Sequence, residues 1–250
     1  MTAVLEVKGL DKKYPLPGRE ILHAVNDVSF SLHDGEFLGL VGESGCGKST
    51  IAKLLVGLEK KSGGRILLDG EEIGEKFEKE YFSQVQMIFQ MPKESFDPRQ
   101  TIHECLVRVQ MNFGMGKNEA RANVPHLLSM VRLPETYAHK YPVRMSGGEC
   151  QRAAIARALA IKPHILICDE ITSALDVSVQ AQIAELLKDL QRENGLSILF
   201  ITHDLALAGG LCDNILVMDR GKIVESGDAK KVLTDPKEAY TKLLIDSVLM

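Results

Sequence analysis

A glycine-rich loop between a predicted buried strand and a predicted helix is the feature that most constrains this chain. Residues 42–49, Gly-Glu-Ser-Gly-Cys-Gly-Lys-Ser, fit the pattern G-x-x-x-x-G-K-[ST]. The continuous apolar run Phe37–Val41 precedes the loop, as expected for a strand covered on both faces. Apolar residues at helical spacing follow it, at Ile51, Leu54, Leu55 and Leu58. The sequence therefore predicts a strand–loop–helix unit that binds the phosphates of a nucleoside triphosphate.

The loop supplies backbone donors and two side chains with chemistry of their own. Glycines let backbone N–H groups converge on phosphate oxygens, and the helix N-terminus adds positive potential. Lys48 is predicted to reach the β- and γ-phosphates, and the Ser49 hydroxyl is predicted to bind Mg²⁺. The predicted nucleotide contacts are Gly42, Ser44, Gly45, Cys46, Gly47, Lys48, Ser49 and Thr50. A glycine-rich turn that binds nothing is the alternative, and the flanking strand and helix argue against it.

Two acidic residues follow a second apolar run, Ile165–Cys168. Because strand side chains alternate, the carboxylates of Asp169 and Glu170 point in different directions. Asp169 suits the Mg²⁺ shell, and Glu170 is placed to polarise an attacking water. Alone, the pair could equally cap the next helix or face solvent. Together with the phosphate loop, it predicts hydrolysis rather than binding only.

Neutral polar groups end two further apolar runs. Gln90 follows Val85–Phe89, and His203 follows Ile198–Ile201 closely. Ligands of open α/β sheets bind beyond the carboxyl ends of the strands, so we expect His203 at the γ-phosphate and Gln90 near Mg²⁺ and water. A structural hydrogen-bonding role is the alternative for His203. The predicted catalytic residues are Glu170, His203, Lys48 and Gln90, and the predicted Mg²⁺ ligands are Ser49, Gln90 and Asp169.

Strands and helices alternate through the rest of the chain. Further strands are predicted at Val28–Leu32, Arg65–Leu68, Ile215–Met218 and Lys222–Glu225, and an amphipathic helix at Val177–Glu193. This order predicts an α/β protein with a mainly parallel sheet, preceded by a strand-rich section. Residues from about Thr101 to Lys162 form an inserted helical block. In that block Pro125 is predicted to kink a helix or to mark its first turn.

Composition excludes several classes of protein. The 250 residues are 45% hydrophobic and 26% charged, which argues against disorder, collagen and coiled coil. A net charge of −4 argues against a broad basic face on nucleic acid. The longest apolar run, Leu205–Cys212, is too short to span a bilayer, and no signal region is evident, so a cytosolic chain is expected unless a partner holds it at a membrane. The five cysteines are widely spaced and indicate neither a disulfide framework nor a zinc site.

A second helix N-terminus is suited to an anion. Ser146 and Glu149 fit a capping box, and Gly147 and Gly148 leave backbone N–H groups accessible. A well-capped helix without a ligand is the alternative. Since the chain has one phosphate loop and two phosphate cradles, we expect the second cradle to serve the nucleotide of a neighbouring subunit. Two chains would then enclose two nucleotides head to tail.

Together these motifs resemble the ATP-binding cassette (ABC) ATPases over essentially the whole chain. Besides the phosphate loop, the match includes Gln90 (Q-loop), Ser146–Glu149 (signature), Ile165–Glu170 (Walker B and the adjacent Glu), Ser173–Asp176 (D-loop) and His203 (H-loop). The resemblance implies one nucleotide-binding domain over 1–250. Its phosphate-loop NTPase (RecA-like) core would cover about 1–90 and 163–250, with an N-terminal antiparallel β subdomain, and a helical subdomain would cover about 91–162. It also implies that Tyr14 stacks on adenine and that Ser146, Gly147, Gly148, Glu149 and Asp176 contact ATP in trans.

By the same resemblance, the chain binds ATP and Mg²⁺ at a dimer interface with a second ATPase subunit. Hydrolysis would drive transmembrane permease subunits that hold the chain at the cytoplasmic face, served by an extracytoplasmic substrate-binding protein. Residues 85–90, 96–99 and 238–244 resemble the branch that imports peptides and nickel. The end at Met250, without the long cysteine-containing extension of larger members, favours the shorter subunits, such as those of nickel importers.

One departure and two other classes of function need tests. Glu149 stands where the signature usually has glutamine, and a carboxylate near a triphosphate is repulsive unless it caps its own helix. A soluble ABC ATPase acting on nucleic acid or ribosomes is one alternative; the chain has neither coiled-coil arms nor a basic tract. A nucleotide-dependent interaction module without turnover is the other, and Glu170 and His203 argue against it.

Overall fold

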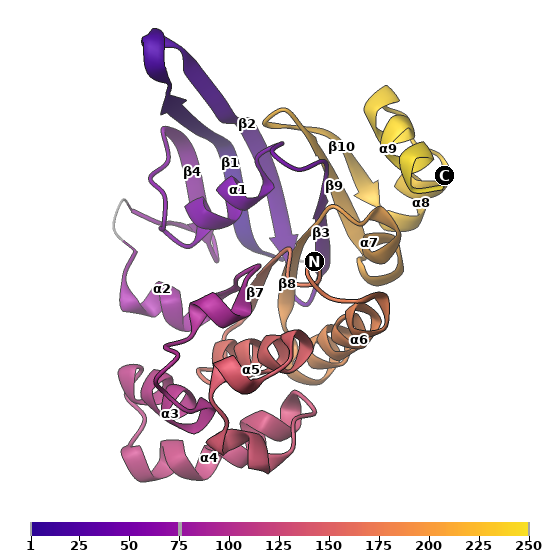
Figure 1. Cartoon of the computed structure of the whole chain (residues 1–250). Coiled ribbons are helices and arrows are strands. Elements are labelled where there is room, and N and C mark those ends of the chain that lie inside the picture. Colours follow the sequence, from indigo (N-terminus) through magenta and orange to yellow (C-terminus); the bar gives the residue numbers. More distant parts are fainter. Residues whose placement is uncertain (1, 75–76, 250) are drawn as a thin grey trace.

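The computed structural model describes residues 2–74 and 77–249 and contains a six-stranded sheet at its centre (Figure 1). The strand order is β10–β9–β3–β8–β7–β6. The bounds are β3 (Phe37–Val41), β6 (Val85–Ile88), β7 (Ile165–Asp169), β8 (Ser197–Thr202), β9 (Asn214–Asp219) and β10 (Lys222–Asp228). All neighbours pair in parallel except β9 and β10. The prediction of a mainly parallel sheet is confirmed, although β6 ends one residue before Phe89.

The strand-rich N-terminal section forms a second, antiparallel sheet. Its order is β2–β1–β4–β5. The bounds are β1 (Ala3–Pro15), β2 (Ile21–His33), β4 (Gly63–Leu68) and β5 (Glu71–Glu72), and the short helix η1 (Pro17–Arg19) joins β1 to β2. Figure 1 shows the tip of the β1–β2 hairpin extending beyond the rest of the molecule. The antiparallel β subdomain expected from the resemblance is therefore present.

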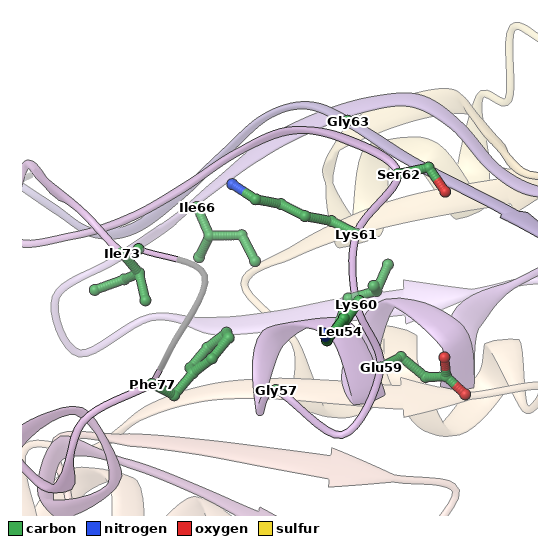
Figure 2. Close-up of a pocket in the computed structure, with 11 residues that line it drawn as sticks. Leu54, Gly57, Glu59, Lys60, Lys61, Ser62, Gly63, Ile66, Ile73 and Phe77 are labelled. Carbon is green, nitrogen blue, oxygen red and sulfur yellow. The ribbon is translucent and has the colours of Figure 1, made fainter.

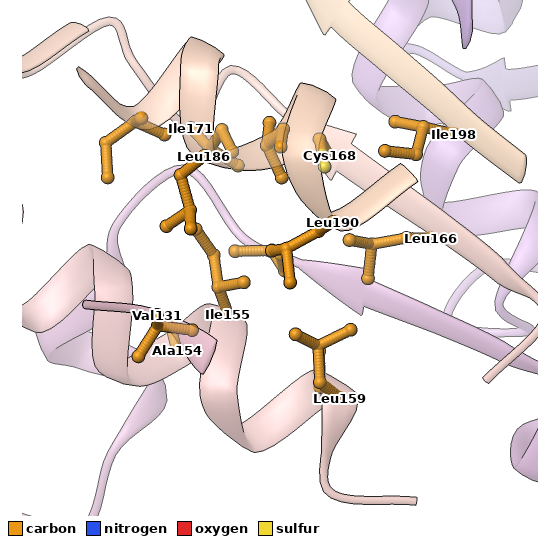
Figure 3. Packing of buried hydrophobic residues seen from close by; sticks show 14 of the residues in the cluster. Val131, Ala154, Ile155, Leu159, Leu166, Cys168, Ile171, Leu186, Leu190 and Ile198 are labelled. Atoms are coloured by element: carbon orange, nitrogen blue, oxygen red, sulfur yellow. The ribbon is translucent and has the colours of Figure 1, made fainter. Parts of the chain in front are cut away.

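Alternation of buried side chains lets the parallel strands serve two separate cores. Phe37 and Val41 of β3 belong to one apolar cluster, and Leu38 and Leu40 belong to the other. The first cluster lies between the sheet and the helices α5 (Gly147–Leu159) and α6 (Val177–Asn194), as Figure 3 shows. The second includes the helix α1 (Lys48–Leu55) and the antiparallel sheet. Strands buried on both faces need apolar residues at every position, which is why these runs are continuous.

The predicted helical block contains two α-helices before α5. These are α3 (Ile102–Asn112), which begins with a capping box between Thr101 and Glu104, and α4 (Lys117–Met130). The short helices η2 (Pro92–Ser95), η3 (Glu135–His139) and η4 (Pro142–Arg144) complete it. Pro125 lies inside α4, so of the two positions predicted for it, a kink within a helix or the first turn of one, the first turn is wrong. The apolar residues Ala120, Val124, Leu127 and Leu128 bury one face of α4 on both sides of the proline, and this packing carries the helix through it.

Four short or terminal helices complete the described chain. They are α2 (Lys79–Gln84), α7 (Leu205–Leu211), α8 (Ala229–Thr234) and α9 (Ala239–Leu249). Within the described residues, no helix combines the length and the apolar character that a membrane crossing needs. All five cysteines are free thiols, and four of them are buried.

Candidate functional site

The phosphate loop joins β3 to α1, as predicted, and close backbone contacts require two of its glycines, Gly42 and Gly47. At Gly42, with φ of +156°, a Cβ atom would lie 2.2 Å from the carbonyl oxygen of Met218. At Gly47, with φ of +115°, it would lie 2.3 Å from the carbonyl oxygen of Ala24. Any larger residue would push the loop off β9 or β2. The backbone is thus fixed before any ligand contributes.

Lys48 is buried beneath this loop, with 3% of its surface exposed. Its Nζ donates to the carbonyl oxygens of Gly42 at 2.7 Å and Glu43 at 2.9 Å. The same ammonium lies 3.7 Å from Glu170 Oε1. Burial of a lysine is tolerated when its charge is paired and its donors are satisfied. The loop therefore holds a preoriented cation at the N-terminal end of α1.

Ser49 and Asp169 form the second polar pair of the site. The Ser49 hydroxyl donates to Asp169 Oδ1 at 2.9 Å, across 120 residues of sequence. Asp169 is 5% exposed at the end of β7, and burial raises the pKa of its carboxyl while the Ser49 hydrogen bond acts in the opposite direction. A hydroxyl and a carboxylate oxygen are the hard ligands that Mg²⁺ prefers. The residues present therefore fit the predicted ion.

Glu170 is the point at which the predicted catalytic side chains meet. Gln90 Nε2 donates to its Oε2 at 3.1 Å, and His203 Nδ1 lies 3.7 Å from the same oxygen. The Glu170 backbone has a φ of +47°, a left-handed conformation that non-glycine residues seldom adopt. Its N–H donates to the Ile201 carbonyl oxygen at 2.9 Å, which holds it in place. Side chains from the ends of β6, β7 and β8 thus converge on one carboxylate beside Lys48.

A cavity of about 400 Å³ lies over this cluster. The loop contributes Ser44, Gly45, Gly47, Lys48, Ser49 and Thr50, and the strand ends contribute Gln90 and Glu170. Tyr14 of β1 lines it as well, with Lys12 Nζ 4.6 Å from the centre of its ring. The structure therefore brings the predicted adenine-stacking residue to the phosphate loop.

Leu22 and Ala24 of β2 also line this cavity and were not predicted from the sequence. Leu22 pairs with Tyr14 in the β1–β2 register, and that pairing is the signal that identifies it once the hairpin is known. Cys46, a predicted nucleotide contact, has its side chain buried at 7% exposure beside Gly42. Its carbonyl oxygen accepts from the N–H of Gly221 at 2.9 Å. The Cys46 side chain therefore packs behind the loop.

The signature residues cap their own helix. The Ser146 hydroxyl accepts from the N–H of Glu149 at 3.3 Å, and Glu149 Oε2 accepts from the N–H of Ser146 at 2.8 Å. Glu149 Oε1 also accepts from the hydroxyl of Tyr137. The Tyr137 hydrogen bond and then the Ser146 backbone bond lower the pKa of Glu149. These hydrogen bonds therefore favour the ionised carboxylate and direct it towards its own chain.

The predicted in-trans residues share one surface. A Cβ at Gly148 would lie 2.5 Å from Val179 Cγ1, and one at Gly147 would lie 3.1 Å from Leu175 Cδ2. Asp176 caps α6 by accepting from the Val179 N–H at 3.0 Å. The signature and the residues before α6 are thus packed together. Among the described residues that line the cavity over the phosphate loop, none comes from 146–149 or is Asp176.

A larger groove of about 710 Å³ adjoins the Ser49–Asp169 pair. It runs from β6 and Gln90 to η2 and α5, and its lining includes Met91, Glu94 and Arg157. The Arg157 guanidinium lies 4.4 Å from the Phe96 ring and donates to the Ser95 carbonyl oxygen. Sequence reasoning missed Arg157 because nothing in its helix distinguishes it from a solvated basic residue.

A separate cavity of about 290 Å³ lies near the C-terminal end of α1 (Figure 2). Leu54, Ile66, Ile73 and Phe77 form its apolar walls, and Lys61 extends across it. None of the predicted site residues lines this cavity in the described part of the chain. It is therefore distinct from the cavity over the phosphate loop.

The fold and these contacts define a class: a phosphate-loop nucleoside triphosphatase, in which polar residues at the ends of parallel strands surround one loop. The model of a known family, described as ABC transporter, matches residues 25–173, more than half of the chain. The chain belongs to this family of ATP-binding cassettes, and its reaction is the hydrolysis of ATP.

Several relatives carry the name oligopeptide transport ATP-binding protein OppF. The one from Bacillus subtilis is 42% identical over 98% of this chain and 82% of its own length. The one from Lactococcus lactis is 39% identical over 99% of this chain and 81% of its own length. The one from Haemophilus influenzae is 44% identical over 95% of this chain and 73% of its own length.

Solved structures agree with this assignment. A dimeric ATP-binding cassette in a post-hydrolysis state, bound to ADP and Pi, superposes with a TM-score of 0.81 at 30% identity, covering 90% of this chain and 99% of that chain. The cbiO1 protein of Clostridium perfringens, part of the ABC transporter complex cbiONQ, superposes with a TM-score of 0.84 at 29% identity, covering 94% and 92%. The predicted class, an ABC ATPase with an α/β phosphate-loop core, is confirmed.

Proposed function

We propose that this chain powers an importer of peptides by hydrolysing ATP in a head-to-tail pair with a second cassette. The observation that carries the proposal is the convergence of Lys48, Gln90 and His203 on Glu170 at one end of the parallel sheet. A carboxylate held beside an ammonium, an amide and an imidazole is suited to orient water towards a phosphate that the ammonium binds.

Each residue has a separate task in this proposal. Lys48 binds the β- and γ-phosphates, and loop N–H groups stabilise the charge that develops during transfer. Glu170 accepts a hydrogen bond from the attacking water. Gln90 and His203 hold the Glu170 carboxylate in position relative to the γ-phosphate. Ser49, Asp169 and Gln90 would hold Mg²⁺, which supplies neutralising charge on the phosphate oxygens. Tyr14 would stack on adenine, with Leu22 opposite it on the hairpin.

The second cassette is proposed because, among the described residues, none of those in the signature lines this chain's own cavity over the phosphate loop. Ser146, Gly147, Gly148, Glu149 and Asp176 would contact the nucleotide bound to the partner, whether that partner is a second copy or a related chain. The solved dimeric relative bound to ADP and Pi supports such a pair. In the pair each chain would provide a phosphate loop for one nucleotide and a signature helix for the other.

Transmembrane permease subunits are the proposed mechanical partners, holding the chain at the cytoplasmic face of the membrane. The groove between Gln90, η2 and α5 is the proposed contact for a permease segment, since Met91 is 55% exposed beside it. This groove adjoins the site through Gln90, so closure around ATP can move it. Residues 91–162 are the proposed helical subdomain, and 1–90 with 163–250 the proposed core.

The substrate assignment rests on the relatives named for oligopeptide transport. Nickel, which the sequence resemblance also suggests, is the second candidate. In both cases an extracytoplasmic binding protein would deliver the substrate. Ligand binding by that protein, measured with a peptide library and with Ni²⁺, distinguishes the two.

The test of the catalytic proposal is Glu170→Gln in the full chain. This variant should bind ATP, form a stable dimer on size-exclusion chromatography, and lose at least about 100-fold in turnover because the base is gone. Glu185→Gln is the control: Glu185 is an exposed acid of α6 that pairs with Arg132 after α4, and this variant should turn over normally. Parent-rate hydrolysis by Glu170→Gln would remove Glu170 from the mechanism. Absence of any copurifying membrane protein from detergent extracts would contradict the importer.

A further inference from the structure

The C-terminal helix α9 reaches the phosphate loop through one side chain. Tyr240 lies in the first turn of α9, and its hydroxyl accepts a hydrogen bond from the backbone N–H of Glu43 at 3.2 Å. Glu43 is the second residue of the loop, 197 positions earlier in the sequence. Residues 238–244 resemble the importer branch named above, but the proposed function assigns them no role.

The peptide group that Tyr240 contacts is also the one that Lys48 contacts. The Gly42 carbonyl oxygen, which accepts from Lys48 Nζ at 2.7 Å, and the Glu43 N–H belong to the same trans peptide. In a trans peptide these two groups point in opposite directions. Tyr240 and Lys48 therefore hold opposite ends of one rigid plane. A hydrogen bond at the N–H also polarises the carbonyl and strengthens its bond to the lysine.

The helix that carries Tyr240 is fixed to the sheet. Glu225 of β10 accepts from the N–H groups of Lys237 at 2.9 Å and Glu238 at 3.1 Å, immediately before α9. Thr241 is fully buried. The β9–β10 turn touches the loop as well, since Gly221 N–H donates to the Cys46 carbonyl oxygen at 2.9 Å. β10, its turn and α9 thus form one support behind the loop.

We propose that Tyr240 is a positioning residue for ATP binding: it fixes the Gly42–Glu43 peptide and, through that peptide, the ammonium of Lys48. The inference rests on the proposed nucleotide role of Lys48. The proposal extends the nucleotide site to α9, which lies outside the phosphate-loop pattern of residues 42–49. Any rearrangement that moves α9 away from β10 would then weaken ATP binding without touching the nucleotide.

The test compares two variants that each delete one hydroxyl. In Tyr240→Phe the dissociation constant of a fluorescent ATP analogue and the KM for ATP should rise about three- to tenfold, the worth of one hydrogen bond, while kcat changes little. Tyr81→Phe is the control, because Tyr81 is buried and its hydroxyl donates to the Leu55 carbonyl oxygen at 2.6 Å, at the other end of α1. Tyr81→Phe should lower the unfolding temperature without moving the KM.

A double-variant cycle separates positioning from general support. In a Lys48→Ala background, Tyr240→Phe should leave the residual nucleotide affinity unchanged, because the hydroxyl acts through the lysine. Equal losses in both backgrounds would overturn the inference, as would a wild-type KM in Tyr240→Phe. Unaltered ATP binding in Lys48→Ala alone would instead refute the proposed nucleotide site. The two failures are therefore distinguishable.

Discussion

Exchanging Glu149 for glutamine should leave ATP hydrolysis close to the parent rate, although this acid lies in the surface proposed to meet a triphosphate. Its two oxygens accept from the Ser146 N–H at 2.8 Å and from the Tyr137 hydroxyl. Both bonds direct the carboxylate towards its own chain. An amide oxygen can accept one of them and keep the capping box. We therefore expect less than about a threefold change in kcat/KM for Glu149→Gln.

The same geometry predicts that Tyr137→Phe is the damaging change. Without the hydroxyl, the carboxylate keeps only its Ser146 bond and gains freedom to turn towards the partner's nucleotide. Two like charges 4 Å apart repel by about 1 kcal/mol in water, a roughly fivefold effect on affinity. ATP-dependent dimerisation should weaken by about that factor in Tyr137→Phe. The double variant Tyr137→Phe/Glu149→Gln should recover the loss, because the repelling charge is gone.

Sedimentation velocity in a Glu170→Gln background measures this dimerisation without turnover, and steady-state ATPase of the otherwise unmodified chain measures kcat/KM. A tenfold gain in rate for Glu149→Gln would show that the carboxylate already weakens ATP binding between the two chains. That result would contradict the hydrogen bonds that direct it towards its own chain. Failure of the double variant to recover would show that Tyr137 acts by packing η3 rather than by holding the carboxylate.

Three further predictions concern the loop, the core and a buried thiol. Gly42→Ala should cost at least about tenfold in ATP-analogue affinity, because its Cβ would lie 2.2 Å from the Met218 carbonyl oxygen; Gly45→Ala, with nothing within 4 Å, should cost less in the same titration. Leu166→Ala, in the core of Figure 3, should lower the free energy of unfolding in urea by about 2–5 kcal/mol, and a loss under about 1 kcal/mol would contradict its full burial. Burial raises the pKa of the Cys150 thiol to about 11, so the native thiol should react with a disulfide reagent far more slowly than the unfolded chain at pH 8 and faster as the pH approaches 11. The folded state binds the Cys150 thiol proton more tightly than the unfolded chain does. The stability that this proton contributes is therefore present below the ordinary thiol pKa and is lost as the pH rises from there to about 11.

Local patterns were sufficient to predict the elements that carry the site. The run Phe37–Val41 with its following glycine identified β3, because a strand buried on both faces leaves an unmistakable apolar sequence. The same reasoning identified the run Ile165–Cys168, which lies in β7 (Ile165–Asp169), and hence the acids that follow it. Parallel strands end at one edge, so Gln90, Glu170 and His203 could be expected together before their contacts were known.

Contacts between distant segments could not be predicted in this way. The sequence around Tyr240 does not predict its hydrogen bond to Glu43, because a tyrosine in a helix is ordinarily a packing residue. The contact of Tyr137 with Glu149 was not predicted either, although Glu149 was identified as unusual, because the two residues lie in different elements, η3 and α5. Pro125 was predicted to kink a helix or to mark its first turn, and only its place inside α4 shows that the first-turn alternative is wrong. These interactions depend on register and docking, which one sequence does not encode as a local pattern.

Two arrangements in one chain make a second chain necessary for the proposed mechanism. Lys48 and Tyr14 line the cavity over the phosphate loop. Among the described residues that line it, the N-terminus of α1 is the one helix N-terminus that could contact the γ-phosphate. The signature helix has such an N-terminus, yet its glycines pack against Leu175 and Val179, beside Asp176. The signature and the start of α6 are therefore packed against each other. In the proposed pair, ATP bound between two chains would draw the signature helix towards the partner's loop, and the groove lined by Gln90 and Arg157 lies between the sheet and α5. For a pair of identical chains, hydrolysis at concentrations below the dissociation constant of the pair should vary with the square of chain concentration, and strictly first-order dependence in that range would exclude such a pair.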